Sequence, residues 1–212
     1  MTYMRKHQTL DPIAESVVER STMPFVGKNH GTSGPVHTSF NDWRLPIEDD
    51  FIKACDEVTG MDKKPIDPWS GDHIGFYNTL GLVNRVGPHK GCRSYAARGY
   101  FEANAQRPNL HVLTEALVNK VILEDNRATG VEFSSGGQVH TAKAKREILI
   151  CAGAIQSPQV LEISGIGDPE VLKAAGVQLK VENKGVGYNL QDHVMTVRAP
   201  PNTADRPLLT IP

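Results

Sequence analysis

Cysteine is scarce in this sequence. The chain has 212 residues and three cysteines, Cys55, Cys92 and Cys151, which are odd in number and far apart. This spacing excludes a disulfide framework and fits no zinc-binding pattern. Cys151 stands in an apolar run, which predicts a small core residue and argues against a catalytic thiol.

Long apolar runs and an excess of one charge are also absent. No stretch approaches the roughly 20 apolar residues that span a bilayer, and the polar start lacks the apolar core of a signal peptide. Lysine and arginine number 23, aspartate and glutamate 24, and the formal net charge is −1. We therefore expect neither a nucleic acid nor a membrane as partner. As written, the chain is expected in the cytoplasm, and no pattern indicates an oligomeric state.

The first half of the chain combines helices with irregular segments. The whole chain of 212 residues is 39% apolar, which suffices for one large domain or two small ones. Apolar residues at helical spacing predict helices over 11–20, 46–59 and 93–104, and a short strand is expected over 36–40. The segment 61–91 is rich in Gly, Pro and Asp, which is typical of a long functional loop.

After residue 110 the pattern changes to short apolar segments separated by turns. Asp125-Asn126 and Gly136-Gly137 are turn signals of the kind that connects hairpin strands. The sequence therefore predicts an antiparallel meander. Its strands are expected over 111–114, 116–123, 130–133 and 138–142.

A continuous apolar run, Glu147–Ala152, follows the meander and predicts a strand buried on both faces. Gly153 then turns the chain, and a helix is expected from Ser157 onward. Small residues at the end of a strand let a ligand approach the backbone, and helix N–H groups suit an anion. This geometry suits a nucleotide cofactor, but the same turn is commonly only structural. The whole pattern predicts an α/β fold with an antiparallel insert.

Several ordered stretches of the sequence carry a more specific signal. The longest reads Gly153-Ala154-x-x-Ser157-Pro158-x-Val160-Leu161-x-x-Ser164-Gly165-Ile166-Gly167. It resembles the second signature of the glucose–methanol–choline (GMC) family of flavoprotein oxidoreductases, and the resemblance covers about residues 28–195. Four shorter stretches also resemble parts of the family sequence: His30-Gly31 with Gly34-Pro35-Val36, Gly91-Cys92-Arg93-Ser94, Asn109 to Thr114 with Val118, and Gly185 to His193.

This resemblance implies FAD as the cofactor and a small-molecule alcohol as the substrate. Val118 would contact the adenine end of FAD through its backbone, and the turn Ala152, Gly153 and Ala154 would line the same end. The implied reaction oxidises a CH–OH group and passes hydride to the flavin N5. The implied fold is mixed α/β: part of a Rossmann-like FAD-binding domain with its antiparallel meander, plus part of a substrate-binding domain.

The resemblance also divides the chain. The expected parts are an N-terminal extension (1–27), part of the substrate-binding domain (28–91), part of the FAD-binding domain (92–195) and a disordered tail (196–212). Two elements of the family pattern are missing from the sequence. No Gly-x-Gly-x-x-Gly motif for the FAD pyrophosphate precedes residue 100. The family's catalytic histidine falls beyond His193, so no catalytic residue or metal ligand is assigned.

Two functions stay open from the sequence alone. The first is an FAD-dependent alcohol oxidoreductase represented by a truncated chain, and the second is a non-catalytic remnant that only binds. A nicotinamide dehydrogenase fits badly, because no complete dinucleotide fingerprint is present. The chain by itself is expected to be unstable and to bind FAD poorly. Neither the substrate alcohol nor the choice between oxidase and dehydrogenase is encoded in a recognisable pattern.

Overall fold

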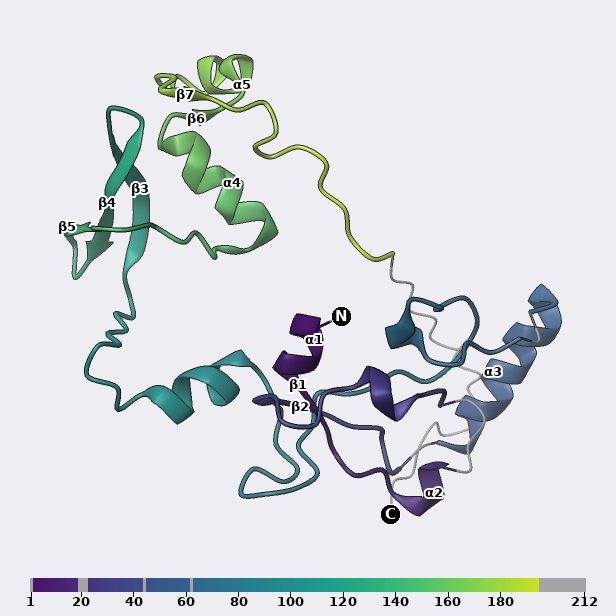
Figure 1. Ribbon diagram of the computed structural model, residues 1–212. Helices are drawn as coiled ribbons and strands as arrows, with labels where there is room; N and C mark the ends of the chain where they lie inside the picture. Colours follow the sequence, from purple (N-terminus) through teal and green to yellow (C-terminus); the bar gives the residue numbers. More distant parts are fainter. Residues whose placement is uncertain (1, 19–22, 44, 62, 195–212) are drawn as a thin grey trace, which may run out of the picture. The chain divides into compact units, whose positions relative to one another are not determined.

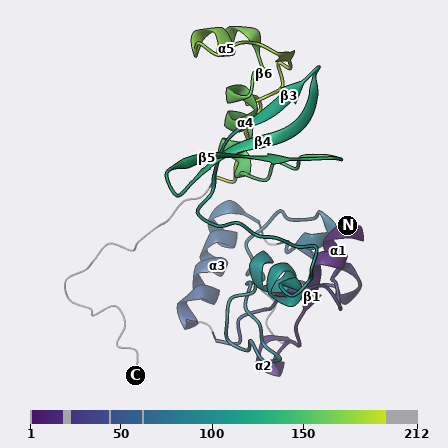
Figure 2. The same ribbon diagram turned by 90° about the vertical axis from the view of Figure 1, so that its left-hand side faces the viewer.

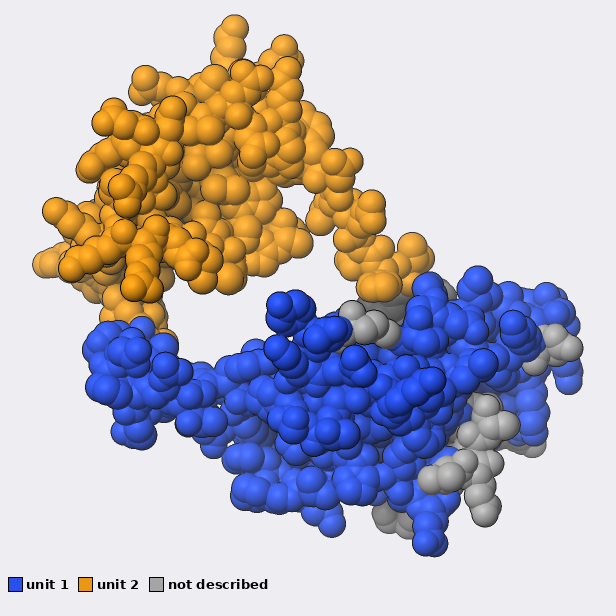
Figure 3. Space-filling model, in the orientation of Figure 1, with its two compact units in different colours: residues 1–111 blue, residues 112–212 orange. Residues whose placement is uncertain are grey.

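The structure is a computed structural model that describes residues 2–18, 23–43, 45–61 and 63–194. It divides into two compact units, residues 1–111 and 112–212, which Figure 3 colours separately. The division falls later than the boundary expected at 91/92, so residues 92–111 belong to the first unit. The tail expected to be disordered, 196–212, lies outside the described residues.

Unit 1 contains short elements joined by irregular chain (Figure 1). The parallel pair β1–β2 aligns Gln8 with Val36. A core of Val17, Met23 and Phe40 is completed by partly buried Ile13, Phe25 and Leu80. The elements are α1 (Thr2–His7), β1 (Gln8–Leu10), α2 (Glu15–Val18), η1 (Gly27–Asn29), β2 (Val36–Thr38), α3 (Pro46–Thr59), η2 (Pro68–Ser70), the π-helix η3 (Ala97–Phe101) and η4 (Glu102–Asn104).

The N-terminal residues form part of this core. Val17 and Met23 are buried, and Gln8 of β1 is buried beside β2. Described residues of the segment 1–27, which was expected to form an extension, thus pack into the core of unit 1. Because apolar side chains from this segment meet Phe40, removing the segment would expose the centre of the unit.

Helix α3 confirms the prediction for 46–59. Pro46 occupies the first turn, where its missing N–H costs nothing, and the Glu48 side chain accepts the Leu45 N–H at 3.1 Å. Gly60 ends the helix in the left-handed region, with φ of 65°. Local signals at both ends therefore fixed this element.

Two other helix predictions in unit 1 are wrong in extent or type. The segment expected over 11–20 is helical only from Glu15 to Val18 among its described residues. The segment expected over 93–104 forms the π-helix η3 and the 3₁₀ turn η4 instead of an α-helix. Gly99 packs against the Pro35 carbonyl, where a Cβ would come within 2.6 Å, so close tertiary packing competes with regular helix geometry there.

Unit 2 is built on the predicted meander. Strands β3 (Leu117–Glu124), β4 (Arg127–Ser135) and β5 (Gln138–Lys143) form an antiparallel sheet in the order β3-β4-β5. The rest of the unit is α4 (Gly153–Ile163), β6 (Ile166–Gly167), α5 (Pro169–Ala174) and β7 (Val181–Glu182). Figure 2 shows α4 lying against the twisted sheet, and β6 pairs in parallel with β7.

Both hairpins of the sheet confirm the turn signals. Asp125 and Asn126 adopt φ of 47° and 61°, and Gly136 and Gly137 adopt 57° and 76°. Two successive residues with positive φ give the turn whose twist matches the flanking strands. The strand predicted over 111–114 is wrong, since these residues carry no regular structure.

The predicted buried strand Glu147–Ala152 is also wrong. None of these residues pairs with any strand in the described part of the chain, and Leu149 is 76% exposed. Cys151 is exposed, which corrects its expected place in a core. An apolar run becomes a strand only when a neighbour completes its hydrogen bonds, so composition alone did not decide this segment.

Helix α4 begins at Gly153, earlier than the predicted start at Ser157. Pro158 therefore lies inside the helix and not in its first turn. The short helix α5 confirms the expected cap, because the Asp168 side chain accepts the Glu170 N–H at 2.9 Å. No helix among the described residues is long and apolar enough to cross a membrane.

Candidate cofactor-binding site

The turn before α4 holds three of the four residues expected to bind cofactor. Ala152, Gly153 and Ala154 are all exposed. The Ala152 N–H is held by the Ser157 hydroxyl oxygen, which accepts it at 3.1 Å. The first N–H groups of a helix have no partner within the helix, so the exposed start of α4 offers donors to a ligand.

Gly153 gives this turn room for a ligand. Its φ is 87°, a conformation that a side chain strains, and a Cβ built on it would meet no atom within 4 Å. Open space beside an exposed helix start lets a planar or polar group approach the backbone. The turn therefore has room for a ligand at its backbone.

Val118, the fourth expected residue, lies on β3 at the edge of the sheet. It pairs with Phe133 of β4, and a bulge separates it from Lys120. Because β3 has a neighbour on one side only, its outer backbone groups are free of the ladder. Val118 thus lies on a strand with one unpaired edge, and no hydrogen bond within the described residues joins it to the 152–154 turn.

Ser164 fixes α4 against this same strand. Its hydroxyl oxygen accepts the Val121 N–H at 2.8 Å, and the hydroxyl donates to the Val160 carbonyl at 2.5 Å. The far end of α4 is therefore attached to the outer edge of β3, which bears Val118 near its start. Sequence reasoning missed this role, although Ser164 lies within the long signature.

Two glycines of the signature are required by close packing. Gly165 adopts φ of 91°, and a Cβ there would lie 2.7 Å from the Gln178 carbonyl oxygen. At Gly167 a Cβ would lie 2.5 Å from the Leu172 side chain. These glycines let β6 approach β7 and α5, so they hold the framework and do not face a ligand.

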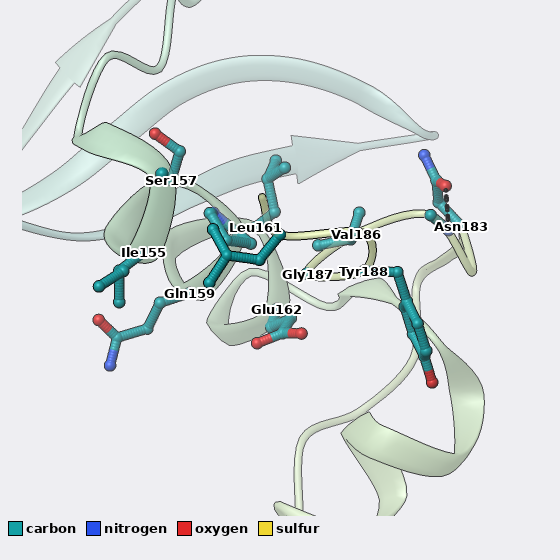
Figure 4. A pocket seen from close by; sticks show the side chains of 13 residues that line it. Ile155, Ser157, Gln159, Leu161, Glu162, Asn183, Val186, Gly187 and Tyr188 are labelled. Atoms are coloured by element: carbon teal, nitrogen blue, oxygen red, sulfur yellow. Dashed lines mark hydrogen bonds between the residues drawn. The ribbon is translucent and has the colours of Figure 1, made fainter. Parts of the chain in front are cut away.

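A groove of about 690 Å³ runs between α4 and the segment that follows β7 (Figure 4). Helix α4 contributes Ile155 and Glu162 to it, and the other wall includes Val186 and Tyr188. Gly187 permits the close approach of the two walls, since a Cβ there would lie 3.1 Å from a Glu162 carboxylate oxygen. The groove starts at Ala154, so it is continuous with the exposed turn.

Tyr188 lines this groove, and the pKa of its phenol is raised. Its hydroxyl donates to an Asp168 carboxylate oxygen at 3.3 Å. The negative charge of Asp168 is the main cause that raises the pKa of Tyr188 above its ordinary value of 10.0. The phenol is therefore a hydrogen-bond donor at neutral pH. Among the described residues, no group of three or more His, Cys, Asp or Glu side chains could hold a metal ion.

Comparison with known proteins gives one consistent result. The sequence model of GMC oxidoreductases matches residues 4–195. Dehydrogenase mpl7 of Monascus purpureus is 41% identical over 201 residues, and the oxygen-dependent choline dehydrogenase of Chromohalobacter salexigens is 38% identical over 172. These alignments cover 92% and 80% of this chain, but only 31% and 30% of the relatives.

A solved structure agrees with these sequence relatives. The FAD-dependent oxidoreductase from Chaetomium thermophilum superposes with a TM-score of 0.78 and 27% identity, over 87% of this chain and 31% of that one. The predicted mixed α/β class, with part of a Rossmann-like FAD domain, is thereby confirmed. The chain spans about a third of the length of its relatives, and it belongs to the GMC oxidoreductase family, flavoproteins whose cofactor is FAD.

Proposed function

We propose that the protein containing these residues oxidises the CH–OH group of a small-molecule alcohol. The observation that carries this proposal is the family match over residues 4–195. One relative, at 38% identity, is named for its action on choline, which is itself an alcohol. When bound, FAD supplies the acceptor for the hydride of the alcohol carbon.

The part of this chain in that reaction is to hold the adenine end of FAD. The backbone of Val118, on the edge strand β3, and the turn Ala152–Ala154 would contact it. Support comes from the exposure of the turn and the open space at Gly153. Ser164 holds α4 at the strand that carries Val118, so it would position both contacts without touching the cofactor.

The substitution Gly153→Ala tests this assignment. A methyl group in the space of a closely packed ligand costs about 1–3 kcal/mol, so FAD should bind about tenfold or more weakly. The measurement is an FAD titration followed by flavin fluorescence in the full-length protein. Gly176→Ala is the matched control, because Gly176 also has positive φ, 69°, and open space but ends α5 away from the turn.

If the two variants lose the same FAD affinity, backbone strain explains both losses, and the turn does not contact the cofactor. The second candidate function is binding of the cofactor without catalysis. Anaerobic addition of choline or another primary alcohol separates the two functions. Bleaching of the flavin absorption band supports the oxidoreductase, whereas a bound flavin that no alcohol bleaches supports the second candidate.

A further inference from the structure

Helix α3 of unit 1 carries a row of apolar side chains along one face. Ile47, Phe51, Ala54 and Val58 follow one another at intervals of four, three and four residues. At 3.6 residues per turn, this spacing places the four side chains within roughly 60° of arc around the helix axis. These four residues form the α3 stripe.

The α3 stripe is exposed to solvent. Ile47 is 67% exposed, Phe51 61% and Val58 87%, and Ala54 is exposed as well. Single exposed apolar residues are common on protein surfaces, whereas a contiguous apolar row along a helix is typical of a packing surface. Intervals of four and three residues are also those by which one helix packs along another.

The stripe is not the face by which α3 joins unit 1. Ile52 is the buried residue of the helix, and it lies roughly 140° around the axis from the centre of the stripe. Among the described residues, no helix or strand packs closely along α3, which lies at the side of unit 1 in Figures 1 and 2. The stripe is therefore a second apolar face of the helix, open to solvent in the described part of the chain.

The charges beside the stripe disfavour a second copy of α3 as its occupant. Asp50 and Glu57 flank the stripe on one side and Glu48 on the other, and Lys53 is the one cation of the helix. Two copies packed along their stripes would bring these carboxylates towards one another. Like charges facing each other across an interface cost free energy, so a different sequence fits this face better.

The size of the stripe favours an occupant from the same polypeptide. Four side chains of this kind present roughly a few hundred Å² of apolar surface, whereas a specific interface buries about 800 Å² on each partner. A segment of the same polypeptide loses no translational freedom when it docks, so a small face suffices. The alignments cover 31% and 30% of the relatives named above, so those proteins contain such segments.

We propose that the α3 stripe is the docking surface for a segment of the same polypeptide outside residues 1–212. The segment places apolar side chains against Ile47, Phe51 and Val58. Docking removes the stripe from water and leaves the contact of Ile52 with unit 1 unchanged.

Hydroxyl-radical footprinting of the unaltered full-length protein, read by mass spectrometry, tests this proposal without a substitution. Phe51 is 61% exposed and Phe40 is 6% exposed, so two side chains of one chemical type can be compared. With the stripe docked, Phe51 should be oxidised about as slowly as Phe40. Oxidation of Phe51 about tenfold faster, the ratio of the two exposed fractions, would show an open stripe and overturn the proposal.

Thiol labelling of full-length variants identifies where the occupant comes from. Val58→Cys places a thiol in the stripe, and Lys53→Cys is the matched control on the same helix, outside the stripe and with a side chain that is 71% exposed. Peptide masses distinguish both from Cys55. The thiol at 58 should react about tenfold or more slowly than the thiol at 53, because it becomes accessible only when the docked segment opens.

Dilution of the protein completes the test. A segment of the same polypeptide protects position 58 equally at every protein concentration. Protection that disappears on dilution would assign the stripe to a second copy and overturn the proposal, and equal labelling of the two thiols would do the same.

Discussion

Replacing Ser164 by alanine should destabilise unit 2 through a single buried hydrogen bond. Ser164 is 2% exposed and Val121 is 3% exposed, so water cannot replace the hydroxyl that accepts the Val121 N–H at 2.8 Å. The Val160 carbonyl still accepts the Ser164 N–H at 3.2 Å in the variant, so only the Val121 N–H loses its partner. A buried N–H without a partner costs about 1–3 kcal/mol, so we expect the free energy of unfolding of unit 2 to fall by that amount.

Urea denaturation followed by far-UV circular dichroism measures this loss. With a slope of about 1–3 kcal/mol per molar urea, the midpoint should fall by about 1 M while the slope stays unchanged. Amide hydrogen exchange adds a local readout, because the Val121 N–H should lose protection before the rest of β3. Both tryptophans lie in unit 1, so their emission follows the other unit and serves as an internal comparison.

Ser157→Ala is the matched control for the same chemical change. The Ser157 hydroxyl accepts the Ala152 N–H at 3.1 Å, but Ala152 is exposed, and water can take over that bond. The Ser157→Ala variant should therefore lose no more than about 0.5 kcal/mol in free energy of unfolding. If both serine variants lose the same stability, burial of the Val121 N–H does not set the cost and the reasoning is refuted.

Two further changes test the sheet and the groove. Gly130→Ala should lower the stability of unit 2 by about 1–3 kcal/mol, because its Cβ would lie 2.6 Å from the Ala142 carbonyl oxygen; an unchanged thermal midpoint would contradict this. Asp168→Asn should lower the pKa of Tyr188 towards 10.0 in an ultraviolet phenolate titration, because it removes the charge that raises that pKa. Asparagine is also a good helix cap, so α5 should survive, and a Tyr188 pKa that does not move would exclude Asp168 as the cause.

The sequence by itself determined the elements whose signals are local. The residues at the two ends of helix α3, Pro46 and Gly60, determine where it begins and ends. The two hairpins follow from pairs of residues that tolerate positive φ, Asp125-Asn126 and Gly136-Gly137. In each case the chemistry that decides the backbone lies within a few residues, so no distant segment is needed.

The long signature from Gly153 to Gly167 identified the family, but its letters did not separate the roles of its residues. The structure shows Gly153 facing open space, whereas Gly165 and Gly167 are required by close packing. Ser164 attaches α4 to β3. A glycine looks the same in sequence whether it admits a ligand or a neighbouring strand, so only the surrounding chain distinguishes the two.

Other features depended on the tertiary structure entirely. The apolar run 147–152 has the composition of a buried strand, yet a strand exists only where a second strand accepts its hydrogen bonds. A buried polar cluster in unit 1 brings together Gln8, His30 and Asp67, which are far apart in the sequence and share no motif. The sequence thus set the local turns, helix ends and family, while folding set which distant donors and acceptors meet, because hydrogen bonds between remote segments leave no local pattern.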